Sequence, residues 1–103
     1  MYAEKVANAV VNGTQELGIL VCGTGIGVSM AANKVRGIRA ALCGDCYSAK
    51  LTRAHNNANV LCLGARTLGS GLALMIVDTF LDTAFEGGRH QTRVDMIHDI
   101  ENR

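Results

Sequence analysis

Apolar and polar positions along the chain divide it into two kinds of segment. Apolar runs at residues 17–21, at 38–43, where only Arg39 breaks the run, and at 59–63 after Asn59 are typical of strands buried on both faces. Helical periodicity predicts helices over residues 3–12, 25–33, 48–54 and 69–83, and a last one carrying Val94, Ile97 and Ile100. Strands that alternate with helices favour an α/β fold with a parallel sheet covered on both faces, in one domain spanning residues 1–103.

The helix predicted at residues 69–83 shows the clearest pattern. Two rows of apolar side chains are expected to face the core, namely Leu72, Ile76 and Phe80 and, beside them, Ala73, Val77 and Leu81. Asp78 and Asp82 are expected to face away. At the other end of the chain, the first helix has no strand before it, so the strand at 17–21 is predicted to form a bare edge. We therefore expect a partner chain to cover that edge.

Composition and charge narrow the class of protein. Apolar residues make up 49% of the 103 positions and tryptophan is absent, so the core is built from aliphatic side chains. A formal net charge of +1 gives no support to a nucleic-acid or membrane-surface partner. No apolar run approaches the ~20 residues of a membrane span, and residues 1–11 lack the layout of a signal peptide. A cytoplasmic protein is expected.

The cysteines at positions 22, 43, 46 and 62 are expected to be reduced thiols. Cys43 and Cys46 have C-x-x-C spacing, but a single pair without a partner at zinc spacing is a weak metal signal. Cys43 and Cys62 lie in apolar runs and are predicted to be small core residues.

Cys22 lies where the first strand is predicted to turn through three alternating glycines, Gly23, Gly25 and Gly27, into a helix. Such a turn aims backbone N–H groups at one point, which suits an oxyanion, a phosphate or a thiolate at Cys22 acting as nucleophile or base. Two other interpretations stay open. One is a ligand-free tight turn, and the other is a dinucleotide loop, with Asp45 as the ribose-binding acid, although Val28 occupies the place of the third glycine. A Walker loop is excluded, since the required lysine is missing.

Histidine and arginine supply the remaining candidate chemistry. His55 lies in a polar run after the predicted helix at 48–54, and a neutral imidazole there can move protons near neutral pH. Arg89 and Arg93 are four residues apart near a helix start, where cations are unfavourable unless an anion offsets them. Together with Arg66, after the third strand, they indicate a phosphate site.

Seven motifs occur in one order along the chain. They are Cys22-Gly-Thr-Gly-Ile-Gly27, Ala31-Ala-Asn-Lys34, Gly37-Ile-Arg-Ala-Ala41, His55-Asn56, Asn59-Val60, Leu63-Gly-Ala-Arg66 and Glu86-Gly-Gly-Arg-His90. With them the chain closely resembles the family of ribose-5-phosphate isomerase B and the galactose-6-phosphate isomerase subunits. The resemblance implies a Rossmann-like three-layer sandwich with a parallel sheet. It also implies an aldose–ketose isomerase that interconverts ribose 5-phosphate and ribulose 5-phosphate through an enediolate, without metal or cofactor.

The resemblance also implies roles for individual residues. The catalytic residues would be Cys22, as the base between the first two sugar carbons, Thr24, which assists at the enediolate oxygen, and His55, which opens the ring. The substrate-binding residues would be Gly23, Gly25, Ile26, Gly27, Asn56, Arg66, Arg89 and Arg93. The partners would be a phosphorylated sugar and further copies of the chain, in a dimer or tetramer whose site spans an interface.

One feature departs from the family pattern. Members begin with a strand carrying an Asp-His pair, followed by a helix and a second strand, whereas Met1 directly precedes the helix expected at 3–12. The chain is thus expected to be truncated at its N-terminus relative to the family. The alternative function is an inactive remnant or interaction module that retains only phosphate-binding and oligomer-forming surfaces.

Overall fold

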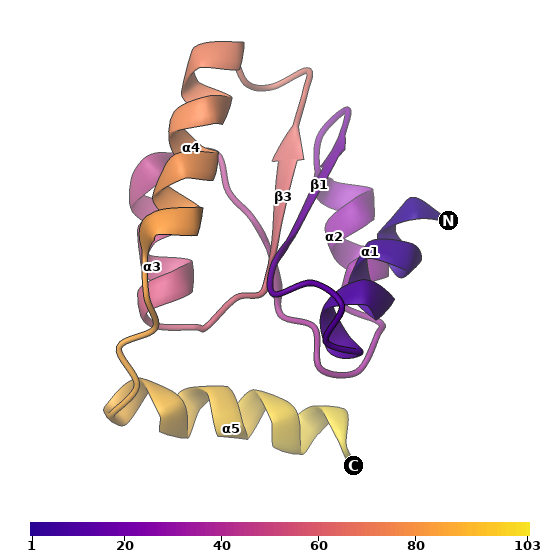
Figure 1. The fold of residues 1–103 in the computed structure, drawn as a ribbon, viewed down its shortest axis with the longest axis vertical. Coiled ribbons are helices and arrows are strands. Elements are labelled where there is room, and N and C mark those ends of the chain that lie inside the picture. The colour runs from indigo at the N-terminus through magenta and orange to yellow at the C-terminus, as the bar shows by residue number, and fades with distance from the viewer.

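The computed structural model describes residues 1–103 as three strands and five helices. In chain order they are α1 (Tyr2–Val11), β1 (Gly18–Cys22), α2 (Ile26–Ala32), β2 (Ala40–Leu42), α3 (Cys46–Ala54), β3 (Val60–Gly64), α4 (Ser70–Asp82) and α5 (Arg89–Glu101). The predicted alternation of strands and helices is confirmed (Figure 1). None of the helices is long and apolar enough to cross a membrane.

The sheet is parallel, with the strand order β1–β3–β2. β3 lies in the centre and every one of its residues is buried, as its continuous apolar sequence predicts. β2 is shorter than the apolar run at 38–43. The amide side chain of Asn33 forms two hydrogen bonds with the backbone of Ala40, of 2.8 and 2.9 Å, and so occupies the outer edge of β2 where another strand would pair.

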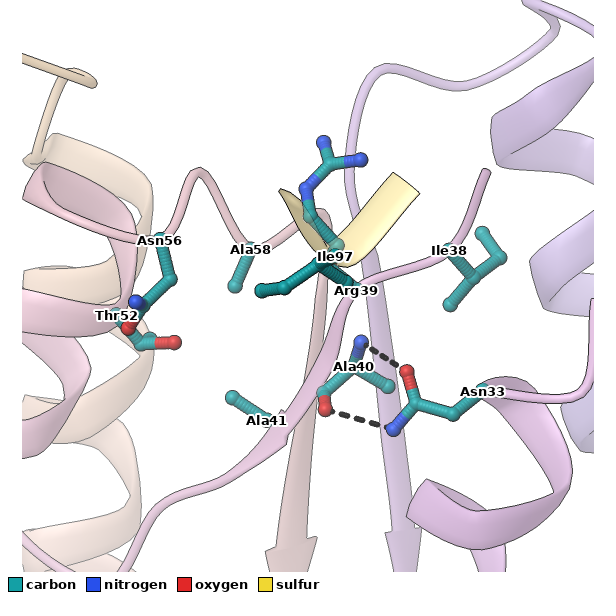
Figure 2. A pocket seen from close by; sticks show the side chains of 9 residues that line it. All are labelled: Asn33, Ile38, Arg39, Ala40, Ala41, Thr52, Asn56, Ala58 and Ile97. Carbon is teal, nitrogen blue, oxygen red and sulfur yellow. Dashed lines mark hydrogen bonds between the residues drawn. The ribbon is translucent and has the colours of Figure 1, made fainter. Parts of the chain in front are cut away.

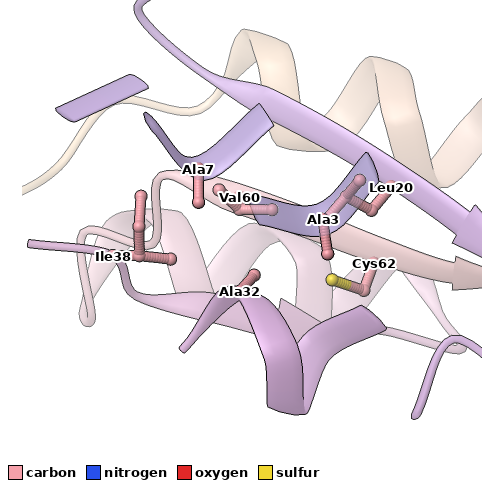
Figure 3. Close-up of a cluster of buried hydrophobic side chains, with 7 residues drawn as sticks. All are labelled: Ala3, Ala7, Leu20, Ala32, Ile38, Val60 and Cys62. Atoms are coloured by element: carbon pink, nitrogen blue, oxygen red, sulfur yellow. The ribbon is translucent and has the colours of Figure 1, made fainter. Parts of the chain in front are cut away.

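Helices cover both faces of the sheet and form two hydrophobic clusters. On one face α1 and α2 pack through small residues, among them Ala7 and Ala32, against Leu20, Val60 and Cys62 (Figure 3). On the other face α3 and α4 enclose a second cluster that contains Leu61, Ile76 and Phe80. The three-layer α/β arrangement expected from the sequence is therefore present.

Two expectations about buried side chains are wrong. Leu72 and Leu81 were expected in the core rows of α4, but 40% and 51% of their surfaces are exposed. β1 was expected to be buried on both faces, but Ile19 and Val21 are exposed. The physical reason is the same, because α4 packs against α3 and β3 and leaves β1, an edge strand, uncovered on that face. β1 also pairs with β3 alone, so the predicted bare edge at β1 is confirmed.

α5 crosses the molecule at the end of the sheet where the strands begin (Figure 1). Only Val94 of this helix is buried. Two hydrogen bonds hold its C-terminal half: Glu101 Oε2 accepts from the N–H of Gly37 at 3.1 Å, and His98 Nε2 lies 2.8 Å from a guanidinium nitrogen of Arg39. α5 is therefore attached mainly to loops, with Val94 as its one buried side chain.

Candidate active site

The loops after β1 and β3 meet at the carboxyl end of the sheet. The N–H of Ala65 donates to the carbonyl of Cys22 at 2.8 Å, and the N–H of Arg66 donates to the carbonyl of Gly23 at 2.9 Å. The arginine side chain also runs along the open flank of Gly23, where an added Cβ would lie 3.5 Å from its Cδ. The sequence predicted that Cys22 and Arg66 share this end of the sheet, and the structure brings them together.

Where the loop after β1 meets the end of β3, Gly25 and Gly64 are both required to be glycine. Gly25 has a φ of +79°, and a Cβ there would lie 2.9 Å from the carbonyl carbon of Leu63. Gly64 faces the same junction from β3, and its Cβ would lie 2.7 Å from the carbonyl oxygen of Thr24. Since both backbones touch here, a side chain at either position would force the two loops apart.

The Cys22 thiol lies inside the turn that these glycines allow. The N–H of Gly25 donates to its Sγ at 3.2 Å. The pKa of the thiol is lowered from 9.0, chiefly by the N–H of Val28; partial burial acts in the opposite direction, and the N–H groups of Gly25, Thr24 and Gly27 add to the lowering. The backbone of the turn thus favours the thiolate, which is the reactive form.

Two other thiols, those of Cys43 and Cys62, are held in the protonated form. Burial raises the pKa of Cys43 to about 11 and that of Cys62 to about 12. Both side chains are fully enclosed in the core, as predicted, and all four cysteines are unpaired. Cys22 is therefore chemically distinct from these two because of its turn.

Thr24 and Asp45 form local hydrogen bonds. Oγ1 of Thr24 accepts from the N–H of Ile26 at 3.2 Å, which leaves the hydroxyl proton available to a ligand.

Asp45 caps α3. The Asp45 carboxylate accepts from the N–H of Ser48 at 2.6 Å and from the Ser48 hydroxyl at 2.9 Å, and these bonds lower the pKa of Asp45. The role of Asp45 is thus in the helix cap, which weakens the dinucleotide interpretation.

His55 lies at the other end of the sheet. It is the C-cap of α3, which runs back from the carboxyl end of β2 toward the start of β3. A five-residue strand separates the two ends, a distance of roughly 16 Å at the usual rise per residue. Within one chain His55 is therefore about a strand length away from Cys22.

The predicted phosphate arginines separate into two groups. Arg89 and Arg93 line a hollow of about 310 Å³ together with His90, at the start of α5. The first turn of this helix holds no acidic residue, and Gly88 provides no side-chain cap. Arg89 and Arg93 are brought together as expected, whereas Arg66 belongs to the Cys22 end.

Asn56 lines a different hollow from Arg89 and Arg93. It lines a hollow of about 270 Å³ beside β2, together with Thr52 and Asn33 (Figure 2). The hydrogen bonds between Asn33 and Ala40 form one wall of this hollow. The predicted role of Asn56 as a sugar ligand stays a prediction.

Glu86 and His90 belong to the motif Glu86-Gly-Gly-Arg-His90, but the sequence predicts no role for them. Oε1 of Glu86 lies 3.8 Å from Nε2 of His55 and 3.5 Å from Nε2 of His90. The two imidazole rings stack with their centroids 4.0 Å apart. The spacing of Glu86 and His90, four residues apart, was visible in the sequence, but their approach to His55 depends on the fold.

Comparisons with known proteins agree with this fold. The family model described as Ribose/Galactose Isomerase matches residues 1–97. Ribose-5-phosphate isomerase B of Escherichia coli is 56% identical over 102 residues, which cover 99% of this chain and 68% of that protein.

Solved structures of two relatives share this fold. Ribose-5-phosphate isomerase B of Clostridium thermocellum superimposes with a TM-score of 0.96 at 56% identity, covering 97% of this chain and 68% of that one. The enzyme of Mycoplasma genitalium, solved with bound ribulose-5-phosphate, gives 0.94 at 50% identity, covering 99% and 68%. The chain thus belongs to the ribose/galactose isomerase family of sugar-phosphate isomerases.

Proposed function

We propose that this protein interconverts ribose 5-phosphate and ribulose 5-phosphate, with Cys22 as the base. The observation that carries the proposal is the cradle of backbone N–H groups around the Cys22 thiol, which lowers its pKa. A thiol in this state is ionised closer to neutral pH, where a base for proton transfer must operate. Relatives named ribose-5-phosphate isomerase B and a relative structure with bound ribulose-5-phosphate support the choice of substrate.

The proposed chemistry uses the same N–H groups twice. The thiolate of Cys22 takes the proton from C2 of the open-chain aldose and returns it to C1, while a second proton passes from the C2 hydroxyl to the C1 oxygen, so that the C2 carbonyl forms. As the sulfur gains the proton its negative charge disappears, while the enediolate oxygen becomes negative. The N–H groups of the turn from Gly23 to Gly27 then stabilise that oxygen, and the hydroxyl of Thr24 donates to it.

The complete site is proposed to lie between two copies of the chain. Cys22 and Arg66 are at one end of the sheet, whereas His55, Arg89 and Arg93 are at the other. A pentose phosphate is shorter than that separation, so one copy would supply the thiol and a second copy the histidine and the two arginines. Exposed apolar side chains on α4 and α5 offer a surface for such a partner: Leu72, Leu74, Met75, Leu81, Met96, Ile97 and Ile100.

A second candidate function is an interaction module that binds phosphate without turnover. The bare edge of β1 favours it, because unpaired backbone groups on an edge strand are available to a partner chain. Such a module would bind ribose 5-phosphate at Arg89 and Arg93 and would not isomerise it.

An assay of ribulose 5-phosphate formation separates the two functions. We expect turnover by the unmodified chain and a loss of about 10²–10⁴-fold in kcat for Cys22→Ala, the usual contribution of a general base. Cys46→Ala, a cysteine outside the turn, is the matched control and should keep its activity. Activity unchanged by Cys22→Ala would reject the assigned base. Calorimetric binding of ribose 5-phosphate without turnover would favour the interaction module.

A further inference from the structure

Three ligating side chains meet at the end of the sheet opposite Cys22. His55, Glu86 and His90 each offer one ligand atom, and these atoms all lie within 4.8 Å of one another. Oε1 of Glu86 lies 3.8 Å from one ε nitrogen and 3.5 Å from the other. One carboxylate oxygen is therefore close to both imidazoles.

Backbone hydrogen bonds hold the three residues in place. The N–H of Glu86 donates to the carbonyl of Ala54 at 3.0 Å and joins the loop before α5 to the end of α3. The N–H groups of His55 and His90 donate to the carbonyls of Leu51 at 2.8 Å and Gly87 at 3.0 Å. Since the backbones are fixed, the three side chains can reach one bound ion by rotation about their own torsions alone.

We propose that His55, Glu86 and His90 bind a zinc ion, with water or a phosphate oxygen in the fourth position. Zinc takes imidazole nitrogen at about 2.0–2.1 Å and carboxylate oxygen at about 2.0–2.2 Å, so neighbouring ligands of a tetrahedral site lie roughly 3.3 Å apart. The two distances to Glu86 are slightly longer than this. Two histidines and one glutamate are also a known donor set for zinc sites with an open position.

Binding requires the stacked rings to turn. Their planes are 9° from parallel and their centroids are 4.0 Å apart, so the in-plane lone pairs of the two rings cannot meet at one ion in this arrangement. The torsion between Cβ and the ring is broad in histidine, and the side chains are 34% exposed in His55 and 16% exposed in His90. Zinc would thus replace the ring stack with two metal–nitrogen bonds.

Charge near the cluster limits the affinity. Arg89 and Arg93 line the adjoining hollow with His90 and repel a cation, whereas the Glu86 carboxylate attracts it. A phosphate oxygen in the fourth position would offset the two arginines. We therefore expect micromolar rather than nanomolar binding of zinc, tightened by inorganic phosphate.

This site would regulate the isomerase proposed above, and that consequence rests on the proposed function. Zinc on Nε2 of His55 would prevent this nitrogen from transferring the ring-opening proton. Inhibition by zinc should therefore be reversed by a chelator. Metal binding itself does not depend on any activity, so the two proposals fail separately.

The decisive experiment is a zinc titration of the whole chain followed by imidazole ¹⁵N NMR. Binding should shift the ε nitrogens of His55 and His90 and leave His98, which contacts Arg39, unchanged. Glu86→Gln and His90→Asn should each weaken binding at least tenfold, whereas Glu4→Gln, on the exposed face of α1, should not. The absence of shifts at His55 and His90, or shifts that persist in both variants, would overturn the proposal. Repeating the titration with Cys22→Ser excludes binding through that thiol.

Discussion

Mixing two inactive variants tests whether the site is shared between chains. Cys22→Ala removes the proposed base at one end of the sheet, and His55→Asn removes the proposed ring-opening group at the other. Each change should reduce activity by about 10²–10⁴-fold when present in every chain. Because the two positions are roughly a strand length apart, about 16 Å, no single chain brings both to one pentose phosphate.

The activity expected for a mixture of the two variants follows from the symmetry of the dimer. In a twofold dimer each site takes the thiol from one copy and the histidine from the other. Random reassociation of the two variants makes half of the dimers mixed, and each mixed dimer has one intact site and one doubly altered site. The mixture should therefore reach about a quarter of the activity of the unmodified protein.

The assay is ribulose 5-phosphate formation before and after the variants are unfolded and refolded together. Each variant refolded alone is the control and should stay inactive. A mixture that gains no activity, although mass spectrometry detects mixed dimers, would refute a site built from two chains.

Three further predictions concern thiol reactivity and stability. Iodoacetamide should modify Cys22 before Cys43 and Cys62, because only the pKa of Cys22 is lowered and the thiolate is the form that reacts. In a plot of the Cys22 modification rate against pH, the midpoint should lie below pH 9.0. Equal modification rates of the three cysteines by mass spectrometry would contradict this. Gly25→Ala should lower the free energy of unfolding, measured by thermal unfolding, by about 1–3 kcal/mol. Gly27→Ala should leave it unchanged, because the space around an added Cβ is open there. Phe80→Ala should cost about 3–5 kcal/mol, and a comparable loss for the half-exposed Leu81→Ala would show that a partner covers α4.

The sheet and the Cys22 end were predictable from local sequence. β3 is apolar throughout because both of its faces are covered, and its residues alone predict a buried strand. Parallel strands end at one edge, so the loops carrying Cys22 and Arg66 were predicted at the same end of the sheet, and the pairing of β1 with β3 makes them neighbours. The burial of Cys43 and Cys62 followed from the apolar runs that contain them.

The opposite end was less accessible to sequence reasoning. A helix that follows a parallel strand returns to the start of the sheet, and this rule places His55 away from Cys22. The meeting of His55 with Glu86 depends instead on a hydrogen bond between Glu86 and Ala54, which joins segments about thirty residues apart and has no periodic signal. The exposure of Leu72 likewise depends on where α4 lies across the sheet.

The separation of the two ends has a consequence for regulation. Zinc bound by His55, Glu86 and His90 would lie about a strand length from the Cys22 thiol of the same chain. It would nevertheless lie directly in the active site of the second copy, because His55 is proposed to complete that site. In the mixed dimers of Cys22→Ala and His55→Asn, the intact site takes its histidine from the Cys22→Ala chain. Adding Glu86→Gln to that chain should make the rescued activity insensitive to zinc, whereas adding it to the His55→Asn chain should not. Equal protection by both additions would mean that zinc inhibits at another place.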